Sequence, residues 1–93
     1  MIQFEWDPEK ARGNEKKHGI PFHEAATVFA DNLSVTFPNS AHLVGEERYI
    51  TIGISEFGKI LLISHAESGD TIRIISARQA TRRERKYYEE ESQ

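Results

Sequence analysis

The chain has 93 residues, no cysteine and a formal net charge of −3. A chain of this length buries only about 60% of the surface that its unfolded form exposes, so we expect one domain over residues 1–93 with a single core. The lack of cysteine excludes disulfides and thiolate metal sites. The first residues resemble no signal peptide, and the longest apolar run, 60–63, is too short to cross a bilayer. We therefore expect a cytoplasmic protein without a membrane partner.

Charge is distributed unevenly along the chain. Residues 1–70 hold 11 acidic and 6 basic side chains, whereas residues 71–88 hold six cations and a single carboxylate. These cations are Arg73, Arg78, Arg82, Arg83, Arg85 and Lys86. Binding of a polyanion depends on the local potential, so this segment suits a nucleic acid despite the acidic total. The alternative is a solvated helix face with internal ion pairs.

Helix signals organise the first thirty residues. Asp7 and Pro8 have the pattern of an N-cap followed by proline in the first helical turn, and Gly19 suits the left-handed position that ends a helix. These signals predict a helix from residue 8 to about residue 18, after a short strand-like opening at residues 4–6. A second helix is predicted over residues 22–30, where apolar side chains recur at helical spacing.

From residue 33 the apolar period changes to two, which is typical of strands. We predict strands over 33–37, 50–54, 60–65 and 71–77, a loop at 39–46, and turns at 56–59 and 67–70. Thr81 and Glu84 match a capping box and predict a last helix from about residue 81 to about residue 90. The expected fold is α+β, an antiparallel sheet meander with two N-terminal helices and one C-terminal helix against one face and the other face free.

The last two predicted strands carry the residues best suited to catalysis. His65 closes one strand, Arg73 lies across a short turn from it, and Arg78 ends the next strand. A histidine at such a place is often structural. Beside guanidinium groups on one sheet face, however, it can take a proton from a 2′-hydroxyl while the cations offset the phosphate charge. We therefore predict that His65 carries protons and that Arg73 and Arg78 face the phosphate.

Two further groups of residues are candidates for chemistry. Of the carboxylates that open the strand at residue 48, Glu46 is expected to be solvated, which leaves Glu47 to orient an arginine or carry a second proton. Tyr87 and Tyr88 are suited to stack on a base, although we expect at least one to pack on the sheet. Metal-ligand spacing, a nucleophile elbow and glycine-rich phosphate loops are absent from the sequence, so we expect no metal and no cofactor.

Several motifs, taken in order, resemble one known family. Residues 14–25, NEKKHGIPFHEA, are similar to the element N-x-x-K-H-G-[IV]-x-F-x-E-A. The matching motifs that follow are GEER at 45–48, IG at 52–53, His65, IRIISARQA at 72–80, and Glu84-Arg85-x-x-Tyr88. The sequence thus resembles the BrnT family of toxins over residues 4–88. Pro21 departs from the family, where a serine cap is common, and this predicts a weaker helix start.

The resemblance implies a RelE-like α+β fold and a metal-independent endoribonuclease that arrests translation. It also implies a BrnA-like ribbon-helix-helix antitoxin, which with the toxin represses their operon, so that operator DNA is reached only through the antitoxin. The motif residues carried over by position are Lys17, His18, Glu47, Arg48, His65, Arg73, Arg78, Arg82, Arg85 and Tyr88. We interpret Lys17, His18 and Arg48 as the rim of an RNA-binding site. Arg82, Arg85 and Tyr88 on the last helix are expected to contact the RNA as well.

Two alternatives remain open at this stage. In the first, the chain is a non-catalytic scaffold that binds the antitoxin and acts as a co-repressor on operator DNA. In the second, it is a nuclease that needs the ribosome to position the message. Growth arrest on expression without the antitoxin separates a nuclease from a scaffold, and cleavage of naked RNA decides whether the ribosome is required.

Overall fold

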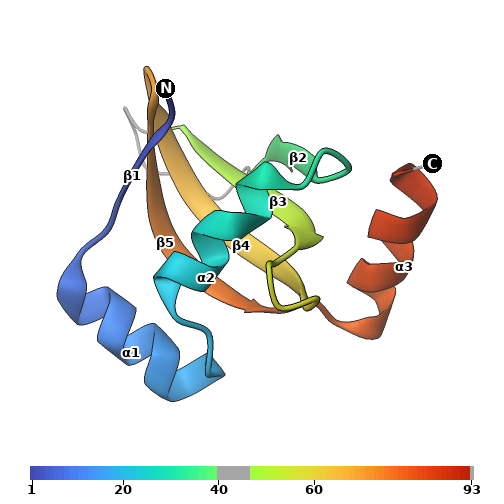
Figure 1. Ribbon diagram of the computed structural model, residues 1–93, viewed down its shortest axis with the longest axis horizontal. Helices are drawn as coiled ribbons and strands as arrows, with labels where there is room; N and C mark the ends of the chain where they lie inside the picture. The colour runs from blue at the N-terminus through green and yellow to red at the C-terminus, as the bar shows by residue number, and fades with distance from the viewer. Residues whose placement is uncertain (40–46, 93) are drawn as a thin grey trace.

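The computed structural model describes residues 1–39 and 47–92. Its elements are β1 (Gln3–Glu5), α1 (Pro8–His18), α2 (Phe22–Thr27), the 3-10 turn η1 (Val28–Ala30), β2 (Val35–Pro38), β3 (Arg48–Ile54), β4 (Ile60–Ser68), β5 (Thr71–Gln79) and α3 (Arg82–Glu91) (Figure 1). This is the order that the sequence predicts. Most of the predicted loop at 39–46, with His42 and Glu46, lies outside the described residues. Within them, no helix is both long and apolar enough to span a membrane.

The five strands form one sheet in the order β1-β5-β4-β3-β2. Strands β2 to β5 are antiparallel neighbours, as expected, but β1 runs parallel to β5 and pairs Gln3 with Thr71 and Glu5 with Arg73. The prediction of an antiparallel meander is therefore wrong, because the sheet is mixed. Two helices separate β1 from β2 along the chain, so no hairpin forces these two strands into antiparallel neighbours, and β1 joins the far edge instead.

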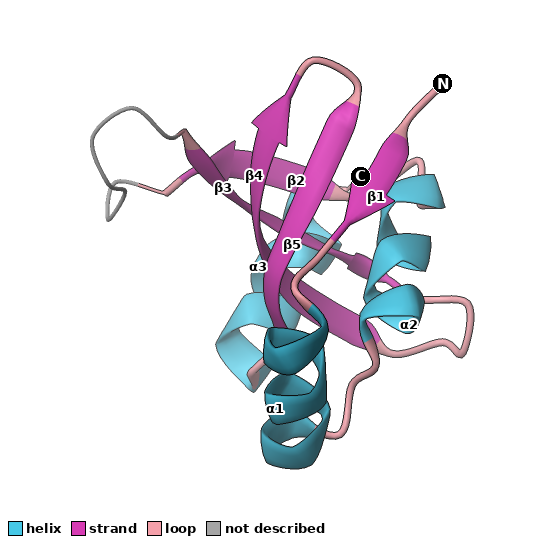
Figure 2. Ribbon diagram, turned by 90° about the vertical axis from the view of Figure 1, so that its left-hand side faces the viewer, coloured by secondary structure: helices cyan, strands magenta, loops and turns pink. Residues whose placement is uncertain are grey.

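Helices cover both faces of the sheet. The inner face presents Leu61, Ile63 and Ile74, which pack against α2, whereas α3 lies on the other side of the strands (Figure 2). The prediction that all helices share one face is wrong. The outer face carries an apolar area around Ile52 and Leu62, and α3 covers part of it.

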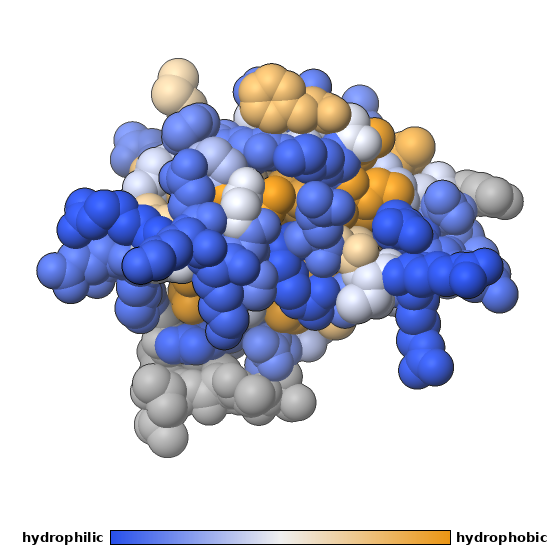
Figure 3. Space-filling model, turned by 90° about the horizontal axis from the view of Figure 1, so that it is seen from below, coloured by the Kyte–Doolittle hydropathy of each residue, from blue (hydrophilic) through white to orange (hydrophobic). Residues whose placement is uncertain are grey.

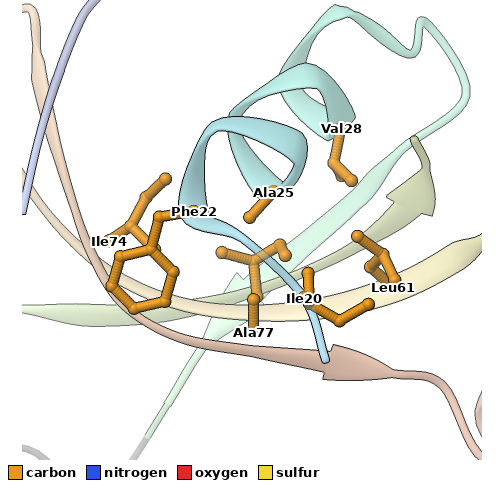
Figure 4. Close-up of a cluster of buried hydrophobic side chains, with 8 residues drawn as sticks. Ile20, Phe22, Ala25, Val28, Leu61, Ile74 and Ala77 are labelled. Carbon is orange, nitrogen blue, oxygen red and sulfur yellow. The ribbon is translucent and has the colours of Figure 1, made fainter. Parts of the chain in front are cut away.

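The main core lies between α2 and the inner face of the sheet. Its buried members are Ile20, Phe22, Ala25, Val28, Leu61, Ile63, Ile74 and Ala77 (Figure 4). Burial of each large apolar side chain contributes about 1.5–3 kcal/mol, so this cluster is the main source of stability. Hydrophilic residues cover most of the side of the molecule that is formed by α1 and α3 (Figure 3).

Asn14 joins α1 to the sheet through a buried side chain. Its Nδ2 donates to the carbonyl oxygens of Ala77 at 2.8 Å and Ile20 at 3.1 Å, and its Oδ1 accepts from the N–H of Ala77 at 3.0 Å. Strand β1 pairs only with residues 71–73 of β5, so it does not reach Ala77. The amide of Asn14 replaces the missing strand neighbour and satisfies both backbone groups of Ala77.

We predict that Asn14→Ala lowers the free energy of unfolding by about 2–4 kcal/mol, because it leaves buried backbone groups of Ala77 and Ile20 without partners. Urea denaturation at neutral pH measures the change. The matched control is Asn32→Ala, at an exposed turn position, which should change stability by less than about 0.5 kcal/mol. Equal effects of the two substitutions would contradict the anchoring role of Asn14.

Candidate functional site

One row of side chains crosses the outer face of the sheet. Glu5 pairs with Arg73, Arg73 with Ala66, and Ala66 with Arg48. Residues paired directly across neighbouring strands project from the same face of a sheet. The two arginines therefore stand on either side of the methyl group of Ala66, with their backbones about 10 Å apart, twice the spacing of neighbouring strands.

The small side chain of Ala66 leaves an open hollow of about 470 Å³ in this row. Its lining is mostly polar and consists of Glu5, Glu47, Ala66, Glu67, Ser68, Thr71 and Arg73. Of the site residues that the sequence named, Glu47 and Arg73 line the hollow, and Arg48 stands in the same row opposite Ala66. The structure adds Glu5, which the sequence did not indicate because the parallel pairing of β1 with β5 has no local signal.

Glu47 is held at the edge of this hollow by Tyr49. The phenol Oη of Tyr49 donates to Oε2 of Glu47 at 2.8 Å. This hydrogen bond and the charge of Glu47 raise the pKa of Tyr49, so the phenol stays protonated and continues to donate. One carboxylate oxygen of Glu47 is thereby oriented.

His65 lies on the inner face, away from the hollow. His65 pairs with Ile74, whereas Arg73 pairs with Ala66, so a single register step places the imidazole and the guanidinium on opposite faces. The predicted convergence of His65 and Arg73 is therefore wrong. The His65 side chain is 0% exposed and packs edge-on against the ring of Phe29, with ring centroids 4.9 Å apart.

Hydrogen bonds hold the buried imidazole of His65 in place. Its Nε2 is 2.8 Å from Oγ1 of Thr51, which is 2.7 Å from Oγ1 of Thr36. Its Nδ1 has no hydrogen-bond partner among the described residues and lies 3.4 Å from Oε2 of Glu67. Burial lowers the pKa of His65 to about 4. At neutral pH the ring is uncharged and has no access to a substrate, so its surroundings are those of a structural histidine.

Arg78 shares the outer face with Arg73 but not its site. Its partner Leu62 and the partner of Arg73, Ala66, are four residues apart along β4, a separation of about 13 Å. The guanidinium donates to both carboxylate oxygens of Glu84, at 2.8 and 3.0 Å. This pair raises the pKa of Arg78 and lowers that of Glu84. Arg78 therefore fastens α3 to the sheet, and the structure does not bring it to the hollow with Arg73, where both were predicted to face one phosphate.

Tyr88 is likewise engaged in structure. It is only 8% exposed, and its hydroxyl donates to Oδ2 of Asp31 at 2.6 Å. Burial and this hydrogen bond raise the pKa of Tyr88 to about 12. Burial opposes the charge of Asp31, but hydrogen bonds from Tyr88 and from the N–H groups of Ile54 and Leu33 outweigh it and lower the pKa of Asp31. Tyr88 offers no surface to RNA, which corrects the prediction of an RNA contact.

The remaining predicted contacts lie away from the hollow. Arg82 and Arg85 are exposed on α3. Lys17 is exposed and His18 is half-buried at the end of α1, which packs near Ala77, about 13 Å along β5 from Arg73. The structure therefore does not bring Lys17 and His18 to the rim of the hollow. In residues 1–39 and 47–92, no group of three or more histidine or carboxylate side chains is arranged to hold a metal.

The site is thus a polar hollow on a sheet face, lined by one arginine and three carboxylates, with a second arginine in the same row. This combination defines a class of site that binds a polar or charged ligand. The family model described as the ribonuclease toxin BrnT of type II toxin–antitoxin systems matches residues 6–84, so the chain belongs to this family. The crystal structure of the Brucella abortus ribonuclease toxin BrnT shares its fold, with a TM-score of 0.69 and 24% identity over 88% of this chain and 100% of that one. None of the curated protein sequences matches.

The buried imidazole of His65 makes a prediction about stability and pH. The unfolded chain binds a proton at His65 below about pH 6.5, but the folded chain does not until about pH 4. The stabilisation is therefore complete above pH 6.5 and is lost as the pH falls towards 4, by about 3 kcal/mol in total.

Urea denaturation of the wild type and of His65→Phe at several pH values tests this. His65→Phe keeps an aromatic ring between its neighbours and should remove most of the loss between pH 6.5 and 4. His23→Gln, at an exposed position, should retain that loss. Parallel pH dependence of the wild type and His65→Phe would show that His65 titrates normally in the fold.

Proposed function

We propose that this chain is the toxin of a type II toxin–antitoxin system and that it cleaves RNA at the hollow that Arg73 lines, in the row that also holds Arg48. The observation that carries the proposal is the row in which both arginines flank Ala66 on one face, with carboxylates around the hollow. The description of the family as ribonuclease toxins supports RNA as the substrate. Guanidinium groups match the geometry of phosphate oxygens, and two of them grip one phosphodiester from both sides.

In the proposed reaction the RNA supplies its own nucleophile. A carboxylate accepts the proton of the 2′-hydroxyl, the 2′ oxygen forms a bond to phosphorus, and the bond from phosphorus to the 5′ oxygen breaks. The 5′ oxygen takes a proton from water as it leaves, and the other product carries a 2′,3′-cyclic phosphate. Arg48 and Arg73 stabilise the charge that develops on the phosphate oxygens, so the proposed reaction needs no metal ion.

Glu47 is the proposed proton acceptor. Its side chain lines the hollow together with Arg73, and Tyr49 fixes one of its oxygens. Glu5 is adjacent to Arg73 in the row, and we assign it to orienting that guanidinium. Outside the hollow, the exposed side chains of Lys17, Arg82 and Arg85 are the proposed contacts for phosphates further along the RNA.

The family implies that an antitoxin neutralises the chain. We propose that this antitoxin is a BrnA-like ribbon-helix-helix protein and that its complex with the chain represses the shared operon, with operator DNA bound only through the antitoxin. We also propose a cytoplasmic location, a fold related to RelE, and arrest of translation as the consequence of RNA cleavage.

Arg73→Ala should reduce the rate of RNA cleavage on the order of a hundredfold, because one fixed cation is lost from the transition state. The assay uses purified chain and naked RNA, together with growth after expression without the antitoxin. Arg12→Ala, which removes an exposed arginine from α1, is the control and should cleave at the wild-type rate. Unchanged cleavage by Arg73→Ala refutes the site. A wild-type chain that neither stops growth nor cleaves RNA is a scaffold, and one that stops growth but spares naked RNA depends on the ribosome.

Glu47→Gln should lower kcat about a hundredfold and leave KM nearly unchanged, because the amide occupies the same space but accepts no proton. Glu56→Gln removes a carboxylate from the exposed turn between β3 and β4 and should have the wild-type kcat. A Glu47→Gln variant with normal kcat would exclude Glu47 as the base.

A further inference from the structure

A second hollow, of about 380 Å³, lies on the outer face between α3 and the sheet. It is lined by Phe37, Ile52, Leu62, Arg83, Glu84 and Tyr87. We call it the α3 hollow. The strand residues of its lining are apolar. Tyr87 is 41% exposed and meets the ring of Phe37 edge-on, with centroids 6.0 Å apart.

The position of α3 beside this hollow is fixed at two points. Near its start, Glu84 accepts two hydrogen bonds from Arg78 of β5. Further along, Tyr88 donates to Asp31, which lies between η1 and β2. Because a helix held in this way cannot settle further onto the sheet, the α3 hollow is a preformed feature of the surface.

Other apolar side chains are exposed close to α3. Leu33 is 54% exposed and Ile54 is 40% exposed. The backbone N–H groups of both residues donate to the carboxylate of Asp31, which also accepts the hydrogen bond from the hydroxyl of Tyr88. The side chains of Leu33 and Ile54 extend the exposed apolar surface beyond the α3 hollow, and a larger exposed apolar surface favours binding of a partner. A phosphate finds no hydrogen-bond donors on an apolar floor, so this surface suits a protein better than RNA.

Charge defines which protein segment fits. Arg83 borders the α3 hollow, and the neighbouring exposed side chains of Arg82, Arg85 and Lys86 are also cationic. The single carboxylate in the lining, Glu84, is already neutralised by Arg78. The last turn of α3, Glu89 to Glu91, is acidic. A complementary segment therefore carries an apolar side chain for the hollow and carboxylates for the first two turns of α3.

We propose that the α3 hollow is the docking site for an acidic amphipathic segment of the antitoxin. The apolar side chain of this segment fills the space between Leu62 and Tyr87, and a carboxylate pairs with Arg83. This inference rests on the proposed function, because it requires an antitoxin. The α3 hollow and the arginine row lie on the same sheet face, so a segment that continues from one towards the other covers the RNA site.

The test compares two charge reversals on the same helix, Arg83→Glu and Lys86→Glu. Lys86 is exposed and does not line the α3 hollow. Each variant is purified, and its affinity for the product of the adjacent antitoxin reading frame is measured by titration calorimetry. Arg83→Glu should raise Kd at least tenfold, whereas Lys86→Glu should change it less than threefold. The two variants should cleave RNA at equal rates, because each makes the same change of charge on α3 outside the RNA-cleaving hollow. Tyr87→Ser, which removes one wall of the hollow, should also weaken binding and serves if Arg83→Glu fails to fold.

Four outcomes overturn the proposal. The first is an unchanged Kd for both Arg83→Glu and Tyr87→Ser, and the second is an equal loss of antitoxin affinity in Arg83→Glu and Lys86→Glu. The third is loss of RNA cleavage in Arg83→Glu while its affinity for the antitoxin stays intact. The fourth is a wild-type chain that sediments as a dimer and an Arg83→Glu variant that sediments as a monomer. The third assigns the face to RNA and the fourth to a second copy of the chain. A wild-type chain that cleaves RNA but binds no antitoxin refutes this inference alone, whereas one that does neither refutes the proposed function.

Discussion

The side-chain amide of Asn14 pairs with the backbone of Ala77 as a neighbouring strand would, and most of the architecture follows from that contact. It holds α1 against the edge of β5 where β1 no longer reaches. With α1 fixed there, the chain before it stays on the β5 edge and the chain after it turns under the sheet to form the core. The place of Glu5 beside Arg73 on the opposite face therefore depends on a polar contact made at the other end of β5.

Local signals made the helices and strands predictable. Asp7 caps α1, Gly19 ends it with a φ of 74°, and Thr81 and Glu84 form the capping box of α3, as their sequence patterns indicate. The sheet order was predicted correctly for β2 to β5, which follow one another along the chain, but not for β1. The parallel pairing of β1 and the position of α3 on the outer face depend on contacts between segments that are distant in the chain. The spacing of apolar residues within a segment predicts its helix or strand but not its distant partner.

The candidate site was predicted in part, for a related reason. Glu47, Arg48 and Arg73 do gather, because hairpin pairing aligns β3, β4 and β5. The sheet face of His65 was predicted wrongly, because a shift of one residue in strand register moves a side chain to the opposite face. Arg78 and Tyr88 look like free functional groups in the sequence, but each has a carboxylate partner that only the folded chain supplies, Glu84 and Asp31 respectively.

Ala66 gives the arginine row a property that charged residues alone do not provide. Its methyl group is the smallest side chain that still maintains a regular strand, and it lines the hollow beside Arg73. A leucine or a glutamine there would fill the space and leave both cations in position. The shape of this surface thus depends on a small side chain as well as on charged ones. A comparison of related chains that considers only acids and bases would overlook Ala66.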